Sequence, residues 1–72
     1  MGIDELSGKL GRRIVQLRDS IGLRQVDLAH KAEIDDGFLR RIETGKVNPT
    51  IKTLEKIANG LEVEIKDLFD FK

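Results

Sequence analysis

The chain has 72 residues, no cysteine, and 13 basic and 13 acidic side chains that give a formal net charge of zero. So short a chain can bury one modest hydrophobic core, which predicts a single domain over residues 1–72. Without cysteine neither a disulfide nor a thiolate metal site can hold it together, so helix packing must do so. No apolar run approaches the roughly 20 residues of a membrane span and no signal-peptide pattern begins the chain, so we expect a soluble, cytoplasmic protein.

The charges are not evenly distributed along the chain. Between Lys9 and Asp19 four bases face one acid, whereas acids dominate from Glu62 to Asp70. This distribution predicts an electrically two-sided molecule, although two ordinary solvated helix faces would show the same pattern.

Apolar residues at three- and four-residue steps predict short helices along the whole chain. Leucine and isoleucine recur in this way from Leu6 to Ile21, which places them on one stripe of a helix over about residues 4–20, with Gly22 suited to end it. The same period predicts further helical segments at about residues 25–32, 36–44, 51–59 and 65–70. No strand pattern competes, so the predicted fold class is all-α, with five short helices.

Residues that begin and end helices occur at suitable positions. Asp35 and Thr50 can cap the third and fourth helices through their side-chain oxygens. Gly45 and Gly60 suit the backbone conformation that follows a helix end. The side chains expected to face the core from the second, third and fourth helices are Leu28, Ala29, Ala32, Leu39, Ile42, Ile51, Leu54, Ile57 and Ala58.

Two short helices joined by a tight turn occupy about residues 25–44. In such a unit the first helix can lie across the phosphate backbone of DNA while the second enters the major groove. Residues 25–45 read QVDLAHKAEIDDGFLRRIETG, and this stretch resembles the phage-repressor-like (XRE-type) helix-turn-helix family. The resemblance covers about residues 9–70 and is carried by Leu17, Arg18, Gly22, Leu23, Gln25, Leu28, Ala29, Ile42, Glu43, Gly45, Asn48, Pro49, Leu68 and Phe69. It implies a compact, five-helix lambda-repressor-like domain that binds double-stranded DNA as a transcriptional regulator.

By this resemblance residues 36–44 form the recognition helix, and Gln25 reaches a phosphate or a base edge from the start of the preceding helix. Arginine can donate two hydrogen bonds to guanine, so we expect Arg41 to be the main base reader. Phe38 precedes Leu39 and should either point outward, toward a thymine methyl group or the sugar backbone, or fold back on the core. The full set of expected DNA contacts is Arg24, Gln25, Asp36, Gly37, Phe38, Arg40, Arg41, Lys46, Asn48 and Thr50.

Asp36 and three residues of the following loop have expected roles other than that of Arg41. Asp36 repels phosphate but can accept a hydrogen bond from cytosine. Lys46, Asn48 and Thr50 fall in the loop before the fourth helix, where the family contacts phosphate. Phosphate contacts position a protein on DNA without specifying a sequence.

Two positions depart from the family pattern. Arg24 stands where the family usually has a small capping residue, which forfeits a side-chain cap but offers a cation near a phosphate. Glu33 stands where the family usually has glycine, so it must form the turn without glycine's conformational freedom.

The resemblance also implies a structural ion pair between Arg18 and Glu43. Removing one partner would leave a partly buried charge, at a cost of about 3 to 5 kcal/mol.

The sequence does not favour an enzyme, a cofactor or a small-molecule ligand. His30 is the one histidine, and with Asp27 and Glu33 at helical spacing it makes at most a weak metal site. The seven glycines are scattered and form no phosphate loop. A stronger alternative is a protein-interaction module of the same fold, an adaptor or an antitoxin, which the zero net charge and the adjacent Asp35 and Asp36 favour.

Members of the family usually bind as two-fold dimers to half-sites about one helical turn apart, roughly 34 Å, so we expect a homodimer on a palindromic operator. Apolar residues are concentrated after the fourth helix, and we expect a dimer interface through the fourth and fifth helices. Its predicted residues are Leu61, Val63, Ile65, Phe69 and Phe71. The alternative is that these residues complete the core of the monomer.

Overall fold

A computed structural model describes residues 2–71 of the chain. Over that range the backbone forms four α-helices and one short 3-10 helix, without strands. These elements are α1 (Gly2–Ser20), α2 (Gln25–Ala32), α3 (Asp36–Glu43), α4 (Ile51–Leu61) and η1 (Ile65–Phe69). The all-α class is therefore confirmed. None of the described helices is long and apolar enough to cross a membrane.

The prediction of five α-helices is wrong for the last segment, which is the 3-10 helix η1. The amide of Asp67 donates to the carbonyl oxygen of Glu64, three residues back, at 3.0 Å. A five-residue segment forms too few α-helical hydrogen bonds to offset the unfavourable free energy of helix nucleation. Short helical segments therefore commonly take the 3-10 form. Leu68 is fully buried and anchors η1 on the rest of the protein.

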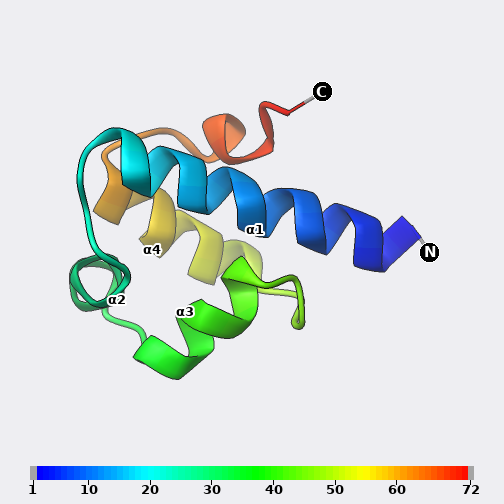
Figure 1. Cartoon of the computed structure of the whole chain (residues 1–72), viewed down its shortest axis with the longest axis horizontal. Coiled ribbons are helices and arrows are strands. Elements are labelled where there is room, and N and C mark those ends of the chain that lie inside the picture. The colour runs from blue at the N-terminus through cyan, green and yellow to red at the C-terminus, as the bar shows by residue number, and fades with distance from the viewer. Residues whose placement is uncertain (1, 72) are drawn as a thin grey trace.

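The long helix α1 crosses the molecule and separates η1 from the two short helices α2 and α3 (Figure 1). The α4 helix packs against both α2 and η1. The largest fully buried side chains come from all five elements and form one core: Ile14, Leu28, Leu39, Ile42, Ile57 and Leu68. The predicted inward residues of α2 and α3 are thus confirmed.

Two predictions for α4 are wrong. Ile51 was expected in the core but is 71% exposed, because it is the first residue of the helix and follows directly on an exposed loop. Gly60 does not end the helix. It is buried within α4, where a β-carbon would come within 2.9 Å of Leu28 Cδ1, so glycine allows α2 and α4 to pack closely. Glu62, with a φ of 62°, takes the left-handed conformation that ends the helix.

Side-chain caps begin two of the helices as predicted. The Asp35 carboxylate accepts hydrogen bonds from the amides of Gly37 and Phe38, at 2.9 and 3.3 Å. The Thr50 hydroxyl accepts one from the amide of Thr53 at 3.1 Å. These bonds satisfy amides that a helix start leaves without partners, and they fix where α3 and α4 begin.

The α1 and α3 helices meet backbone to backbone at a glycine. A β-carbon on Gly11 would lie 2.6 Å from the carbonyl oxygen of Ile42 and closer still to that of Glu43. Just beyond α3, a β-carbon on Gly45 would lie 2.9 Å from the Cα of Gly8. No larger residue fits at Gly11 unless the two helices separate.

We predict that Gly11→Ala lowers the free energy of unfolding by about 2 kcal/mol, because the new methyl group overpacks this contact. Gly8→Ala is the matched control on the same helix. A β-carbon there meets only the flexible end of Arg12, at 3.4 Å, and alanine favours helix, so we expect no loss or a gain of up to about 1 kcal/mol. Urea unfolding checks both, and equal effects would contradict the close approach.

The turn between α2 and α3 is made by Glu33, whose φ of 58° lies in the left-handed region. Its amide donates to the carbonyl oxygen of His30, and the next amide, of Ile34, donates to that of Ala29. Glutamate thus adopts the conformation that glycine usually supplies, and the turn forms despite the departure from the family pattern. A side chain in this region costs about 1 to 2 kcal/mol.

Glu33→Gly should therefore raise the free energy of unfolding by about 1 kcal/mol, by removing this strain. The control is Glu55→Gly, in the middle of α4, where the same exchange should lower stability by about 1 kcal/mol because glycine disfavours helix. Thermal or urea unfolding measures both. A loss of stability in Glu33→Gly would show that the side chain contributes more than the strain costs.

Candidate nucleic-acid interface

The α2 and α3 helices form the predicted two-helix unit, on the side of α1 opposite η1 (Figure 1). The inner side of α3 carries the buried Leu39, Ile42 and Glu43. Its outer side carries Asp36, Arg40 and Arg41, which are exposed, and Gly37 and Phe38, which are half-buried. The loop that follows α3 lies on the same side of α1 (Figure 1). The predicted DNA contacts therefore lie on α2, on α3 or in the loops that precede α2 and follow α3.

Glu43, at the end of α3, joins three helices through its carboxylate. Arg18 of α1 donates to both carboxylate oxygens, from Nε at 2.9 Å and from Nη2 at 3.2 Å. Arg18 Nη1 also donates to the carbonyl oxygen of Leu23, at 2.9 Å. The side chains of Arg18 and Glu43 are only 13% and 4% exposed, so this bidentate pair is largely removed from water. We refer to it as the Glu43 clamp.

Gln25 is the third partner in the clamp. Its Nε2 donates to Glu43 Oε1 at 2.8 Å, across 18 residues of sequence. The sequence indicated Gln25 as a DNA contact but did not indicate this bond. The bond holds the Gln25 side chain between α2 and α3, at the start of α2.

Breaking the clamp from the α3 side should destabilise the fold. In Glu43→Gln the guanidinium of Arg18 remains, largely buried, with only the exposed carboxylate of Asp19, 3.9 Å away, as a counter-charge, so we predict a loss of about 3 kcal/mol in the free energy of unfolding. Asp27→Asn removes a half-buried carboxylate from its exposed partner Arg24 and should leave the free energy of unfolding nearly unchanged. Urea unfolding compares the two variants. Equal losses would show that burial does not set the strength of the clamp.

Arg24 precedes α2 and binds Asp27 in its first turn. The guanidinium donates from Nε to Asp27 Oδ2 at 2.9 Å and from Nη2 to Oδ1 at 3.1 Å, and the Arg24 amide donates to the same carboxylate at 3.3 Å. The side-chain hydrogen bond from Arg24 is the main cause that holds the pKa of Asp27 below its usual range. Asp27 thus satisfies the amide of Arg24, and the guanidinium, 77% exposed, remains at the surface.

The side chains of Phe38 and Arg41 lie against each other on α3. The guanidinium carbon of Arg41 is 5.9 Å from the centre of the Phe38 ring, within the range of a cation–π contact. The ring is half-buried and packs against the core, so Phe38 both folds back on the core and presents part of its surface. Asp35, beside them, is engaged as the helix cap.

The loop between α3 and α4 holds the three predicted phosphate contacts. Lys46 is exposed. Asn48 accepts a hydrogen bond from the hydroxyl of Ser7 at 2.8 Å, which ties the loop to α1. Thr50 caps α4, and its hydroxyl also donates to that of Thr53 at 3.1 Å. The side chains of Asn48 and Thr50 therefore hold the loop in place.

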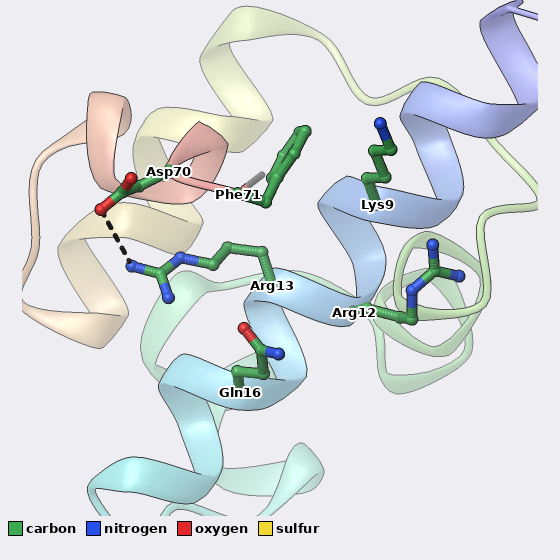
Figure 2. A pocket seen from close by; sticks show the side chains of 6 residues that line it. All are labelled: Lys9, Arg12, Arg13, Gln16, Asp70 and Phe71. Carbon is green, nitrogen blue, oxygen red and sulfur yellow. Dashed lines mark ion pairs between the residues drawn. The ribbon is translucent and has the colours of Figure 1, made fainter.

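A basic hollow that the sequence did not indicate lies on the other side of α1. It has a volume of about 370 Å³ and is lined by Lys9, Arg12, Arg13, Gln16, Asp70 and Phe71. Figure 2 shows Lys9 and Arg13 on the side of α1 that faces Phe71, while Arg12 extends away from Phe71. The ammonium group of Lys9 lies 5.8 Å from the centre of the Phe71 ring.

The basic run of α1 and the acidic end of the chain meet at Arg13. Arg13 donates to the carbonyl oxygen of Asp67 at 2.9 Å and pairs with Asp70 at 3.8 Å, an ion pair drawn in Figure 2. Because η1 packs along α1, the basic run and the acidic end of the chain lie side by side and partly neutralise each other.

The structure corrects one residue of the predicted dimer interface. Leu61 is 3% exposed and belongs to the core of the monomer, because the last turn of α4 faces inward. Val63 and Ile65 are half-buried and pack against the same core. Phe69 is 38% exposed, with its ring centre 6.3 Å from that of Phe71. Phe69 is the most accessible of these residues, and Phe71 is half-buried.

The described residues hold no group of three or more histidine, aspartate or glutamate side chains placed to bind a metal ion. Every fully buried side-chain nitrogen or oxygen in the same part of the chain has a hydrogen-bond partner.

Comparison with known proteins agrees with this arrangement. Residues 14–68 match the family model described as Helix-turn-helix. The chain is 38% identical over 64 residues to the HTH-type transcriptional regulator SinR of Bacillus subtilis, covering 88% of the chain and 58% of SinR. It is 36% identical over 62 residues to the HTH-type transcriptional regulator DdrOP3 of Deinococcus deserti, covering 86% of the chain and 48% of DdrOP3.

Among solved structures, the restriction-modification controller protein C.AhdI from Aeromonas hydrophila superimposes with a TM-score of 0.86 at 32% identity. The match covers 88% of this chain and 96% of C.AhdI. By contrast, the chain spans about half the length of the two regulators, 58% of SinR and 48% of DdrOP3.

Proposed function

Because the chain belongs to the helix-turn-helix family, we propose that it is a sequence-specific DNA-binding transcriptional regulator, and not an enzyme, with α3 entering the major groove. The observation that carries this proposal is the Glu43 clamp. It fixes α3 against α1 and holds Gln25 at the start of α2, so the outer side of α3 is presented on a rigid base. Side chains that read bases need such support, because small displacements cost binding.

The proposed DNA contacts follow from the position of each side chain. Asp36, Gly37, Phe38, Arg40 and Arg41 lie on the outer side of α3 and would face the bases. Arg24 and Gln25 lie at one end of the face, and Lys46, Asn48 and Thr50 lie in the loop after α3; these five would contact phosphates. Amides and side chains at such positions fix the register of a protein on the duplex.

A homodimer on a palindromic operator is part of the proposal. One recognition helix reads few base pairs, so two copies related by a two-fold axis extend the site to half-sites about one helical turn apart. We propose an interface that contains Phe69 and Phe71, with Val63 and Ile65 at its border. An apolar surface shared by two copies would cover the exposed ring of Phe69 and the half-buried ring of Phe71.

Two alanine variants separate base reading from phosphate contact. Arg41→Ala should weaken binding to the preferred sequence by about tenfold and leave helicity unchanged, because a bidentate contact to guanine is lost. Lys46→Ala should weaken binding to all sequences and lower the salt dependence by about one unit, because one phosphate contact is lost. Fluorescence anisotropy over a salt series measures both. Parent-like binding by both variants would contradict the proposed orientation of α3.

Selection from a random duplex library, with the hydrodynamic mass measured at the same low salt, tests the proposal as a whole. We expect a palindrome with half-sites about one turn apart, and the mass of a dimer. A folded sample that enriches no sequence would contradict the proposal. It would favour instead a protein-interaction module of the same fold, which the zero net charge and the exposed Asp36 also fit.

A further inference from the structure

The Arg41 side chain lies near the start of α3, although Arg41 is the sixth of its eight residues. Its guanidinium carbon is 5.9 Å from the centre of the Phe38 ring. Its Nη1 lies 3.7 Å from the position that a β-carbon on Gly37 would occupy. The side chain therefore runs back over the first turn of α3, alongside Phe38 and across Gly37. The Asp35 carboxylate lies at the same place, with its Oδ2 3.1 Å from that β-carbon position. The first turn of a recognition helix is the part that contacts base edges.

Both groups are held in place by the protein. Phe38 packs against the core, and its amide donates to the Asp35 cap at 3.3 Å. None of the ion pairs in the described part of the chain includes Arg41, and the Phe38 ring lies beside its guanidinium. A cation held by an aromatic face keeps all of its N–H donors available for a ligand.

Such a pair matches one feature of the major groove. Guanine presents two acceptors, N7 and O6, to a bidentate arginine, and the C5 methyl group of a pyrimidine is an apolar target for an aromatic ring. When the pyrimidine precedes the guanine on the same strand, its methyl group lies beside the N7 edge. The guanidinium carbon and the centre of the Phe38 ring are 5.9 Å apart, so the two groups can reach neighbouring bases, which are about 3.4 Å apart along the strand.

We propose that Phe38 and Arg41 act as one unit that reads a C5-methylated pyrimidine followed by guanine, with Arg41 on the guanine and Phe38 on the methyl group. The pyrimidine is thymine or 5-methylcytosine, which share this chemistry. The inference rests on the proposed function and names the sequence element that α3 recognises.

The first test uses the unaltered protein and modified DNA. In the half-site obtained by selection, uracil in place of the thymine of the thymine–guanine step removes only the methyl group, and we expect affinity to fall about fourfold. Cytosine and 5-methylcytosine at the same position should differ by a similar factor, and this arm shows whether a methylated cytosine can replace thymine. Uracil in place of a thymine outside the step is the control and should change nothing.

The second test assigns the two roles. Phe38→Ala should bind the thymine and uracil duplexes equally. Arg41→Ala removes the guanidinium donors, so it should lose the preference for guanine over 7-deazaguanine while it retains the dependence on the methyl group. Circular dichroism verifies that both variants are folded. If Phe38→Ala does not fold, the comparison of thymine and uracil duplexes with the unaltered protein still tests the proposal.

The outcomes separate this inference from the proposed function. A selected operator whose half-sites contain no pyrimidine–guanine step, or equal affinity for thymine and uracil at that step, overturns the inference and leaves a sequence-specific regulator. Failure to select any sequence overturns both. If the unaltered protein binds the thymine duplex about fourfold more tightly than the uracil duplex, and Phe38→Ala binds the two equally, then Phe38 reads the methyl group as proposed.

Discussion

The structure depends on one carboxylate. Glu43 receives two hydrogen bonds from Arg18 and one from Gln25, and so it joins α1, α2 and α3 at a point that water hardly reaches. A buried carboxylate is costly unless it is paired and its oxygens are satisfied, and both conditions are met here. Because the pair orients the end of α3 and the start of α2 together, the two parts of the proposed DNA-binding face share a single support.

That support also requires that α1 and α3 touch. Gly11 lets their backbones meet, and Gly45, just beyond α3, lies against Gly8 in the same way. The opposite side of α1 serves another purpose, since Arg13 there holds η1 through Asp67 and Asp70. The α1 helix therefore separates the proposed DNA-binding face, on α2 and α3, from the side on which η1 covers the core.

Much of the fold could be predicted from the sequence, because helix periods and caps are local. Asp35 caps α3 as expected, and the all-α class followed from the apolar spacing. The errors concern tertiary contacts. Gly60 was expected to end the fourth helix, but it lies within α4 and allows close packing against α2. Leu61 was expected in a dimer interface, but it is buried in the core. The hydrogen bond from Gln25 to Glu43 joins residues 18 apart in the sequence, and no local sequence pattern predicts it.

The claim that the α2–α3 face binds DNA is tested most directly by amide chemical shifts. The measurement is a titration of isotope-labelled protein with the selected duplex, followed by NMR. We predict that the largest changes occur at Gln25, in residues 36–41 and at Lys46, with little change around the hollow formed by Arg13 and Phe71. Changes confined to that hollow would contradict the account, because they would place the ligand on the opposite side of α1.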